Sequence, residues 1–406
     1  MTQQPQNKLQ NKTVLISGAG VAGPALAYWL RRYGFTPTVV EQAPSLGDGG
    51  YKVDLRGVAM KVIDRMGLTP AITRHSTRMR GGAWVNAAGK PLATLGPDLI
   101  GLRAPGDDEV LRGDLARILY EVTKNGVEYL FGDTVTGVAQ SDAGVEVTFA
   151  RSAPRVFDLV IGADGLHSTV RAHVFGEETR FVRPLGMHAC VFTVPNHLGL
   201  DHWELIYASP GKVVNLYSTQ RSTAKAQFIF PTPAEVPGRH DVAAQQRLIA
   251  ETFAGAGWET DALLAAMPQS PDFYFDSASQ VHLDRWSDGR VALVGDAAHS
   301  PSPLSGQGTS LALVGAYVLA GELKAAHGDH RVAFARYQEE MRGYVDVNLT
   351  LGESNAKQMV AGSKRQILMQ TTMMRLVNRL PWKDLALRPI LKPLNQAANA
   401  LTLADY

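Results

Sequence analysis

The pattern of apolar and polar positions predicts an α/β chain at its start. Residues 13–17 show no polar alternation, which is typical of a strand buried on both faces. A Gly-rich turn and helical composition over 22–32 follow, and a second strand over 37–41 completes what we interpret as a βαβ unit. Apolar residues recur at three- and four-residue spacing over 56–66 and 113–124, which predicts two further helices.

The middle of the chain has a different pattern. Short β-branched and aromatic segments, punctuated by Gly, Pro, Asn and Ser, predict an extended and mainly antiparallel sheet. These segments are 134–149, 156–163, 181–194, 203–208, 212–219 and 225–231. Residues 242–254 return to a helical pattern, and a buried strand over 290–294 leads through a Gly/Ser/Pro-rich turn into a helix over 307–325. The simplest interpretation is a nucleotide-binding domain interrupted by a sheet-based domain, with its last parallel strand arriving late.

The two ends of the chain look simpler. Residues 1–12 are polar and predict a loose arm, and the chain beyond Arg331 is almost free of strand signals. Four of the eleven methionines fall between 359 and 374, and such soft side chains suit the wall of a pocket for a bulky ligand. A helical layer on the core is the simpler explanation for any single Met. The positions that share one helical face are Leu368, Thr372, Met373, Leu376 and Leu380.

Composition narrows the class of protein without choosing a function. The 406 residues, 45% apolar and 19% charged, predict a globular chain of two or three domains. A net charge of +2 gives no reason to expect nucleic acid or a membrane as a partner. Cys190 is the one cysteine, so an intramolecular disulfide and a cysteine-rich zinc site are both excluded, and core burial is its expected role. With no signal-peptide pattern and no apolar run of ~18 residues, we expect a soluble cytoplasmic protein.

The first motif is Gly18-x-Gly20-x-x-Gly23, between the first strand and its helix. Gly18 permits a tight turn, Gly20 lets the backbone approach a pyrophosphate, and Gly23 allows close packing of helix on strand. The helix N-terminus beyond it favours anions. Glu41, at the end of the second strand, suits ribose hydroxyls rather than a 2′-phosphate. A lone motif of this kind could be a structural turn, but this context predicts a site for NAD or FAD.

Two later turns also follow strands. Asp164-Gly165 precedes a polar helix start, and alone it could be a structural corner with Asp164 as a helix cap. Gly295-Asp296 ends the late strand, where a carboxylate can bind sugar-like hydroxyls. A helix beginning near 306–308 would point its positive end at the same place, which suits negative charge on a reduced flavin. His299 has no second histidine at metal-ligand spacing, so we interpret it as structural and expect no metal.

In this order the three motifs resemble the FAD-dependent aromatic hydroxylases of the para-hydroxybenzoate hydroxylase type (group A flavoprotein monooxygenases). The resemblance covers most of residues 13–345. It implies an α/β fold: an interrupted Rossmann-type FAD-binding domain, an inserted substrate domain built on an antiparallel sheet, and C-terminal helices. The residues it assigns to FAD are Gly18, Gly20, Val21, Ala22, Gly23, Glu41, Arg112, Asp164, Asp296, Gly306, Gly308, Thr309 and Ser310.

We expect domain boundaries to follow from this arrangement. Residues 1–175 and 276–345 would form the two parts of the FAD-binding domain, with some substrate-domain elements near 75–110. Residues 176–275 would form the substrate-binding sheet domain. Residues 346–406 would be a helical segment that serves as a lid over the substrate site.

Three segments resemble a narrower group, the tetracycline-inactivating flavin monooxygenases or tetracycline destructases. They are 49–57 (GGYKVDLRG), 272–276 (DFYFD) and 315–323 (GAYVLAGEL). In that group the first segment lies beside the flavin ring, so the resemblance makes Asp54 and Arg56 cofactor contacts. Arg56 and Pro303 are then the candidates for positions beside the reacting ring, with no general acid or base assigned. An exposed arginine at a helix start explains Arg56 equally well.

Other features mark departures from the wider family. Ser310 and Gly315 stand where many hydroxylases carry Asn and Asp after the Gly-Gln-Gly turn. Residues 42–48 contain no Lys or Arg, although many relatives have a basic group there, so the choice between NADH and NADPH stays open. The group's C-terminal helix over the substrate entrance would match residues 363–380.

The resemblance also implies a reaction. NADPH or NADH binds transiently and reduces FAD, and the reduced flavin carries O2 as a C4a-hydroperoxyflavin that hydroxylates an electron-rich aromatic or enolic carbon. No second GxGxxG follows a strand, which disfavours Baeyer–Villiger enzymes with two nucleotide domains. The alternatives are a flavin-dependent reductase and a non-catalytic flavin- or ligand-binding module. Halogenases are disfavoured because no Trp-x-Trp occurs, and α/β-hydrolases because no G-x-S-x-G occurs.

The expected substrate is a planar polycyclic small molecule, either tetracycline or another polyketide-like compound. Its contacts are predicted from the middle sheet and the tail helices, at Trp203, Tyr207, Tyr217, Arg221, Phe228 and Met373. Core burial explains each aromatic singly, whereas the cluster suggests a hydrophobic pocket. We expect a monomer or homodimer, and antibiotic inactivation and secondary metabolism stay open as alternative roles.

Overall fold

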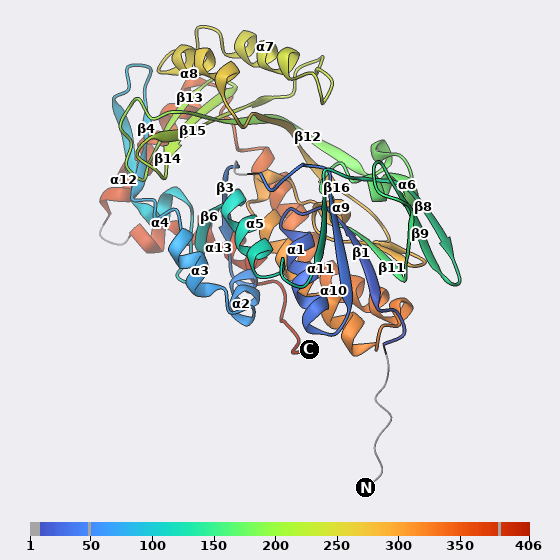
Figure 1. The fold of residues 1–406 in the computed structure, drawn as a ribbon. Helices are drawn as coiled ribbons and strands as arrows, with labels where there is room; N and C mark the ends of the chain where they lie inside the picture. Colours follow the sequence, from blue (N-terminus) through green and yellow to red (C-terminus); the bar gives the residue numbers. More distant parts are fainter. Residues whose placement is uncertain (1–8, 48–49, 381–382) are drawn as a thin grey trace.

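The computed structural model describes residues 9–47, 50–380 and 383–406. Figure 1 shows two sheet layers, one above the other, with the two described ends of the chain on the lower layer. Gly49 and the residues before Leu9, from the predicted polar arm, lie outside the described residues, as do 381–382 of the predicted helical tail. The mixed α/β fold with C-terminal helices confirms the fold class expected from the sequence.

The lower layer is a six-stranded sheet whose central strands run parallel. Its order is β17 (Ser287–Asp288), β18 (Val291–Leu293), β11 (Leu159–Gly162), β1 (Thr13–Ser17), β2 (Thr36–Glu41) and β7 (Glu128–Phe131). β1 pairs in parallel with β2 and β11, and β18 continues the parallel set beside β11. The late strand therefore returns to the first sheet, as expected. The 156–163 segment differs from the prediction, because β11 is buried between two parallel neighbours and does not join an antiparallel sheet.

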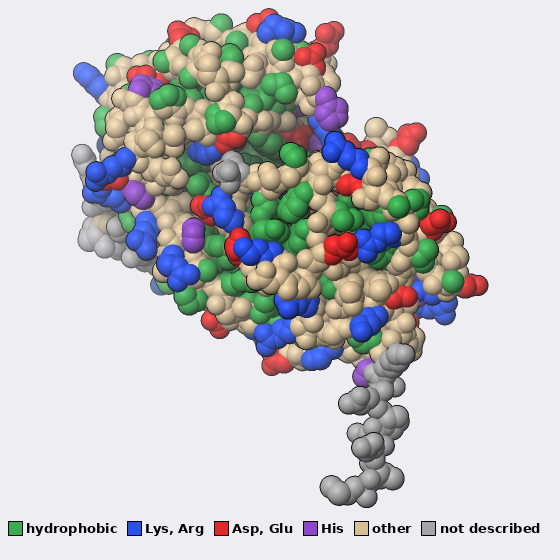
Figure 2. Space-filling view, in the orientation of Figure 1, with side chains coloured by type: hydrophobic (Ala, Val, Ile, Leu, Met, Phe, Trp, Pro, Cys, Tyr) green, Lys and Arg blue, Asp and Glu red, His purple; other side chains and the backbone are tan. Residues whose placement is uncertain are grey.

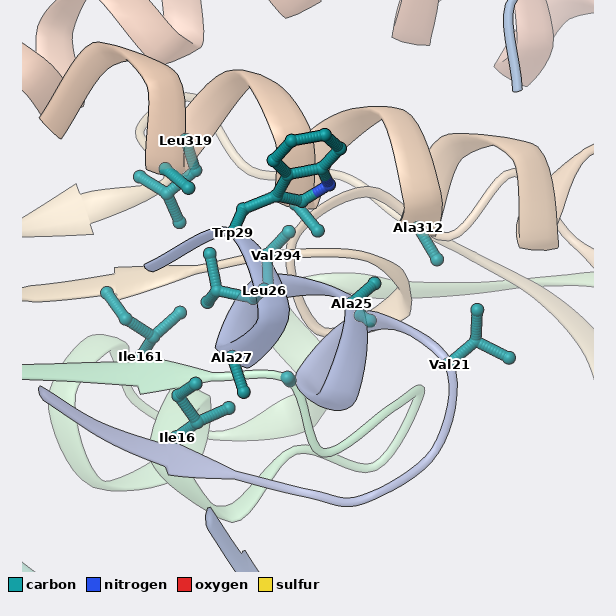
Figure 3. Packing of buried hydrophobic residues seen from close by; sticks show 14 of the residues in the cluster. Ile16, Val21, Ala25, Leu26, Ala27, Trp29, Ile161, Val294, Ala312 and Leu319 are labelled. Carbon is teal, nitrogen blue, oxygen red and sulfur yellow. The ribbon is translucent and has the colours of Figure 1, made fainter. Parts of the chain in front are cut away.

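Helices cover the parallel sheet and carry its connections. They are α1 (Ala22–Arg32), α5 (Arg112–Glu121), α10 (Gly308–Ala325) and α11 (His330–Ala356). Figure 3 shows α1 between the strands, where Ile16 and Ile161 lie, and α10, where Leu319 and Ala312 lie. Leu26 and Trp29 of α1 are almost wholly buried in this core. This packing fixes the direction in which the α1 N-terminus points.

The upper layer is a seven-stranded sheet, antiparallel except where β13 runs alongside β4. Its order is β16 (Tyr274–Val281), β12 (Val182–Pro195), β15 (Thr223–Pro231), β14 (Lys212–Ser218), β13 (Trp203–Ser209), β4 (Gly81–Val85) and β5 (Pro91–Leu95). β4 and β5 lie within the 75–110 region, and the expected boundary at 275–276 falls inside β16. Figure 1 shows α7 (Val242–Phe253) and α8 (Thr260–Ala266) on its upper face.

Period-2 alternation gives the upper sheet two different faces. The face under α7 and α8 buries a large apolar core that includes Cys190, Phe228 and Phe253, which confirms the expected burial of the cysteine. The opposite face carries Met187, Val213 and Ile229, which cluster with Leu304 of η3 (Pro303–Ser305). Because η3 belongs to the turn after β18, this second face looks toward the parallel sheet. We call it the cleft face, and Figure 2 shows the surface hollowed between the two layers.

The remaining elements complete the connections. β8 (Val135–Ser141), β9 (Gly144–Phe149) and β10 (Arg155–Phe157) form a small antiparallel sheet, and β3 (Lys52–Leu55) pairs with β6 (Asp108–Leu111). The other helices are α2 (Val58–Arg65), α3 (Thr69–His75), α4 (Pro97–Ile100), α6 (Thr169–Phe175), η1 (Glu178–Arg180), η2 (Met267–Gln269), α9 (Asp296–His299), α12 (Lys364–Arg379) and α13 (Lys383–Ala398). Across the described ranges, no helix combines the length and apolar character needed to cross a membrane.

Candidate cofactor and substrate site

Three turns meet above the carboxyl ends of β1, β11 and β18. Parallel strands end at one edge of a sheet, so their turns gather there. The first turn holds Gly18, Gly20 and Gly23, the second holds Asp164, and the third holds Asp296. The side chain of Arg112 reaches the same region, because a Cβ built on Gly20 would lie 3.4 Å from its Nη2. The predicted motif residues are therefore neighbours in the structure.

The glycines of the first turn meet different constraints. Gly18 has φ +106°, and a Cβ there would lie 2.6 Å from the carbonyl oxygen of Ala163. A Cβ on Gly23 would lie 1.9 Å from the carbonyl oxygen of Gly18, so only glycine lets α1 start this close to the turn. A Cβ on Gly20, in contrast, would meet only Arg112 Nη2 within 4 Å, apart from the adjoining residues of the chain. The space beside Gly20 is open to a ligand.

The N-terminus of α1 faces that open space. Its N-cap residue is Val21, followed by Ala22, and no side chain caps the helix. Glu41 lies beside the turn, where its carboxylate accepts hydrogen bonds from the backbone N–H of Ala19 at 2.7 Å and of Ala43 at 2.9 Å. Glu41 thus holds the glycine turn in place while remaining partly accessible. Uncapped N–H groups and the helix dipole suit an anionic group here.

The third turn brings Asp296 to the start of α10. A Cβ on Gly308 would lie 3.6 Å from Asp296 Oδ1, so the carboxylate lies over the N-terminus of this helix. Asp296 is accessible from the cleft, yet the surrounding protein desolvates it and raises the pKa of its carboxyl, an effect that Arg112 opposes. Thr309 and Ser310 lie in the first turn of α10, which has no side-chain cap. Pro303, in η3, is exposed.

A second segment, β3, reaches the same turn. A Cβ on Gly306 would lie 3.9 Å from Asp54 Oδ2, and the backbone N–H of Arg56 donates to Ser310 Oγ at 3.4 Å. Burial raises the pKa of the Asp54 carboxyl, and the neighbouring Arg56 opposes that rise. Asp54 Oδ1 has no hydrogen-bond partner, nor do Oε1 and Nε2 of the wholly buried Gln307. These orphaned polar atoms lie in a part of the site that the protein alone leaves unsatisfied.

The environment of Arg56 differs from the alternative considered above, an exposed arginine at the start of a helix. It is only 3% exposed, and its guanidinium pairs with Asp54 at 2.8 Å and with Asp107 at 3.7 Å. It also donates to the carbonyl oxygens of Gly101 and Leu102. The exposed alternative is wrong, because β3 and the 101–107 loop enclose the side chain. Arg56 holds this loop against Asp54.

Asp164 makes the contacts of a structural corner, although it is not the helix N-cap considered for it. Its carboxylate accepts from the hydroxyls of Ser17, Ser168 and Thr169 and from the backbone N–H of Val170. Ser168 is the N-cap residue of α6, so Asp164 supports the corner rather than serving as the cap itself. The side chain remains partly accessible at the edge of the site.

Three predicted substrate residues lie on the wrong face of the upper sheet. Tyr207 and Phe228 are buried in the core under α7 and α8, where Phe228 contacts Phe253 with ring centroids 4.8 Å apart. Trp203 packs against the same core. Because residues 203, 205 and 207 alternate away from the cleft face, none of these rings reaches the space between the layers.

The other three candidates have three different environments. Tyr217 is on the cleft face, and its hydroxyl accepts a hydrogen bond from the backbone N–H of Lys52 at 3.2 Å. Arg221 is exposed in the turn between β14 and β15. Met373 is 51% exposed on the outer side of α12. Tyr217 alone among the six projects from the cleft face, but Lys52 covers its ring and leaves the side chain only 2% exposed.

The structure adds polar residues that sequence reasoning missed. Asn215 on β14 and Gln227 on β15 are cross-strand partners on the cleft face, with Asn215 Nδ2 donating to Gln227 Oε1 at 3.4 Å. Asn215 Oδ1 is buried without a partner. The two-residue spacing from Val213 to Tyr217 was the signal that could have found them. They place an amide pair on the cleft face beside the apolar Val213 and Ile229.

A buried charge network links the two layers. Lys52 Nζ on β3 lies 2.6 Å from Glu204 on β13 and 3.6 Å from Glu109 on β6. Burial disfavours the ammonium form, but the two carboxylates more than offset this and raise the pKa of Lys52 above its usual range. This network fixes β3, and with it Asp54, against the upper sheet.

His167 makes a second link near the mouth of the site. Its Nδ1 lies 2.9 Å from Glu178, and its Nε2 lies 3.1 Å from Asp276 on β16. Burial disfavours the imidazolium, but the hydrogen bonds to the two carboxylates prevail and raise the pKa of His167. His299, in contrast, is wholly buried against Trp286, which lowers its pKa to about 3 and fits the expected structural role. Within the described residues, no group of side chains is arranged to hold a metal ion.

Comparison with known proteins gives the family of this architecture. The model of the FAD binding domain family matches residues 11–344. An uncharacterized protein of Mycobacterium tuberculosis is 48% identical over 352 residues, which cover 85% of this chain and 93% of that protein. A flavin-dependent monooxygenase from an unknown prokaryotic organism is 44% identical over 342 residues, covering 84% and 88%. The crystal structure of tetracycline destructase Tet(51) is similar with a TM-score of 0.86 and 36% identity, covering 98% of this chain and 100% of that one.

Proposed function

We propose a reaction and a substrate class for this chain from the premise that it belongs to the FAD binding domain family and is a flavin-dependent monooxygenase. The substrate is a planar polycyclic molecule with phenolic or enolic rings, of the tetracycline kind. The observation that carries this choice is the likeness to a tetracycline destructase, which extends over 98% of the chain and includes both sheet layers. NADPH or NADH serves as the reductant and O2 as the second substrate.

The residues of the site fit FAD. The open space beside Gly20 and the uncapped α1 N-terminus suit its pyrophosphate, with Arg112 supplying positive charge. Glu41 lies where the adenosine ribose would bind, and Asp296 where ribityl hydroxyls would donate to a carboxylate. Asp54 Oδ1 and the Gln307 amide are buried polar atoms without partners, and the polar edge of a flavin ring would satisfy them.

The chain's own residues orient and protect the reaction. The N-terminus of α10, at Gly308 and Thr309, would stabilise negative charge on a flavin bound beside it. The Lys52 network holds β3, so Asp54 and Arg56 would present fixed polar groups to a bound flavin. Bound FAD, once reduced, supplies the activation of O2 for transfer of one oxygen atom to the substrate. The site lies between the two sheet layers, which would limit the access of water to the reacting ring.

The cleft face supports a flat and mostly apolar ligand. Met187, Val213 and Ile229 form apolar surface beside Leu304 on this face. The Asn215–Gln227 pair supplies the amide contacts that would fix hydroxyl or keto groups at one edge. A polycycle with oxygen atoms along one side complements this pattern.

One panel experiment separates this proposal from its two alternatives. Purified holoenzyme is assayed for NADH and NADPH oxidation with tetracyclines and other polycyclic phenols, and each product is analysed by mass. Substrate-stimulated oxidation with a gain of one oxygen is the expected result. Substrate-dependent oxidation without O2 uptake would favour the reductase. A flavin-loaded protein that shows no stimulated oxidation with any ligand would favour the binding module.

A further inference from the structure

The outer side of α12 carries apolar side chains that are exposed to solvent. Leu368 is 65% exposed, Met369 66%, Met373 51% and Leu376 58%. They follow one another at helical spacings and form one continuous stripe, which we call the α12 stripe. The opposite side of the helix, with Ile367, Thr371 and Met374, has lower exposure and packs inward; α12 contacts β5 and β13. Figure 1 shows α12 at the outer left edge of the upper sheet.

The segment around the stripe is strongly basic, although the whole chain is nearly neutral. Residues 357–398 hold eight lysines and arginines and a single acidic residue, Asp384, which gives the segment a net charge of +7. The whole chain carries +2, so the rest of it carries −5. Lys364 and Arg365, in the first turn of α12, are exposed, and Arg365 lies three and four residues before Leu368 and Met369. Cations and apolar side chains therefore share one outward face.

We propose that the α12 stripe and the cations around it dock the protein onto the surface of an anionic lipid bilayer. A helix with Leu and Met on one face and Lys and Arg on and beside that face matches an interfacial helix, which inserts its apolar side chains at headgroup depth. Long cationic side chains reach up to the phosphates while their stems cover apolar surface. Each basic residue near an anionic leaflet strengthens binding by about five-fold.

The charge also argues against other occupants of the α12 stripe. A second copy docked stripe to stripe would bring two segments of net charge +7 together, and like charges repel at this range. Nucleic acid would pair with the cations but would leave four apolar side chains against a charged backbone. A bilayer alone offers negative charge at its surface and apolar chains directly beneath. The inference does not rest on the proposed substrate, and its test does not use turnover as its main readout.

The test is co-sedimentation of FAD-loaded full-length protein with lipid vesicles. Vesicles of phosphatidylglycerol mixed with phosphatidylcholine should bind the protein at least about ten-fold more strongly than phosphatidylcholine alone. Raising the salt from 0.1 M to 0.5 M should release most of it, because screening weakens the cation contacts. Equal binding to both vesicle types, or binding to neither, would overturn the proposal.

Two sets of variants separate the contributions of the stripe and of its charge. Leu368→Gln with Met369→Gln and Leu376→Gln should lower vesicle binding about ten-fold or more, and Lys364→Gln with Arg365→Gln should do so at low salt. The matched control is Val156→Gln, which removes an equally exposed apolar side chain (65%) on β10 and should leave binding unchanged. FAD absorbance and melting temperature report whether each variant is folded.

Two further outcomes would assign the α12 stripe to another role. If the stripe variants bind vesicles normally but light scattering shows a wild-type dimer that they dissociate, the stripe is an interface between copies. If they bind vesicles normally but raise the KM for a polycyclic substrate, the stripe captures substrate. Either result would overturn the membrane proposal.

Discussion

Gly20→Val should weaken FAD binding strongly without harming the fold of the cofactor-free protein. Gly20 is not in the left-handed region, so a β-branched residue is sterically allowed in its backbone conformation. A Cβ there meets only Arg112 Nη2, at 3.4 Å, and this is the mobile end of a flexible side chain. The apo-protein should therefore change in stability by less than about 0.5 kcal/mol. Any large effect must come from the ligand.

The size of that effect follows from the contacts that the valine would block. A pyrophosphate at the α1 N-terminus accepts charge-assisted hydrogen bonds from backbone N–H groups, each worth about 1.5–3 kcal/mol. Loss of two such contacts weakens FAD binding by about 10²–10⁴-fold. Gly23→Ala is the contrasting variant, because its Cβ would lie 1.9 Å from the Gly18 carbonyl oxygen and must displace the turn itself.

The assay is titration of apo-protein with FAD, followed by flavin fluorescence, together with melting temperatures measured with and without FAD. Wild-type protein should gain melting temperature with FAD, since a ligand that binds only the folded state stabilises it. Gly20→Val should match the wild-type apo-protein and gain almost nothing. Gly23→Ala should melt lower even without FAD. Full flavin occupancy of Gly20→Val, or an apo melting temperature as low as that of Gly23→Ala, would refute the reasoning.

Three other substitutions test separate parts of the site. Asp296→Ala should weaken FAD binding about 10- to 100-fold through loss of a carboxylate acceptor for ribityl hydroxyls, and a variant purified with full flavin would contradict this placement. Asn215→Leu should raise the KM for the polycyclic substrate about ten-fold while leaving substrate-free NAD(P)H oxidation unchanged; an unaltered KM would remove Asn215 from the substrate contacts. His167→Gln should lower the melting temperature below pH 6.5, by an amount equivalent to about 1 kcal/mol. Only the imidazolium can donate to Glu178 and Asp276 together, and folding raises the pKa of His167. The stability that this bridge adds is therefore complete below the pKa of the unfolded state. It is lost as the pH rises through the pKa of the folded state. A difference between wild type and variant that stays constant up to pH 9 would exclude the bridge.

Local patterns were enough to predict the parts of the fold that depend on neighbours in sequence. The first βαβ unit and the helix over 307–325 have continuous apolar runs or strong helical periodicity, and both appear within one residue of their expected ranges. The glycine turn, Glu41 and Asp296 could be placed together because the carboxyl ends of parallel strands share an edge.

The errors share a physical cause. Alternation shows that Trp203 and Tyr207 lie on one face of a strand, but it does not say which face looks at the cleft, and the positions of α7 and α8 decide that. Periodicity likewise placed Leu368 and Met373 on one face of a helix. That face is the exposed one, because Ile367 and Met374 form the packed side instead.

The contacts that sequence reasoning missed join distant segments. Lys52 and Glu204 are 152 residues apart in the sequence, and no short sequence pattern predicts such a pair. The Asn215–Gln227 pair needs the register between β14 and β15. The net charge of the whole chain also gave no sign that residues 357–398 carry +7, because opposite charges elsewhere in the 406 residues cancel it. The two contacts depend on tertiary placement, whereas the segment charge can be read from the sequence once it is counted locally.

The central claim is that this chain transfers one atom of O2 to a polycyclic substrate, and isotope labelling tests it most directly. Holoenzyme is incubated with NAD(P)H, tetracycline and ¹⁸O2, and the product is analysed by mass spectrometry. We predict consumption of NAD(P)H that depends on substrate and a product heavier by one ¹⁸O atom. A product without ¹⁸O, formed with full consumption of NAD(P)H under ¹⁸O2, would contradict the account.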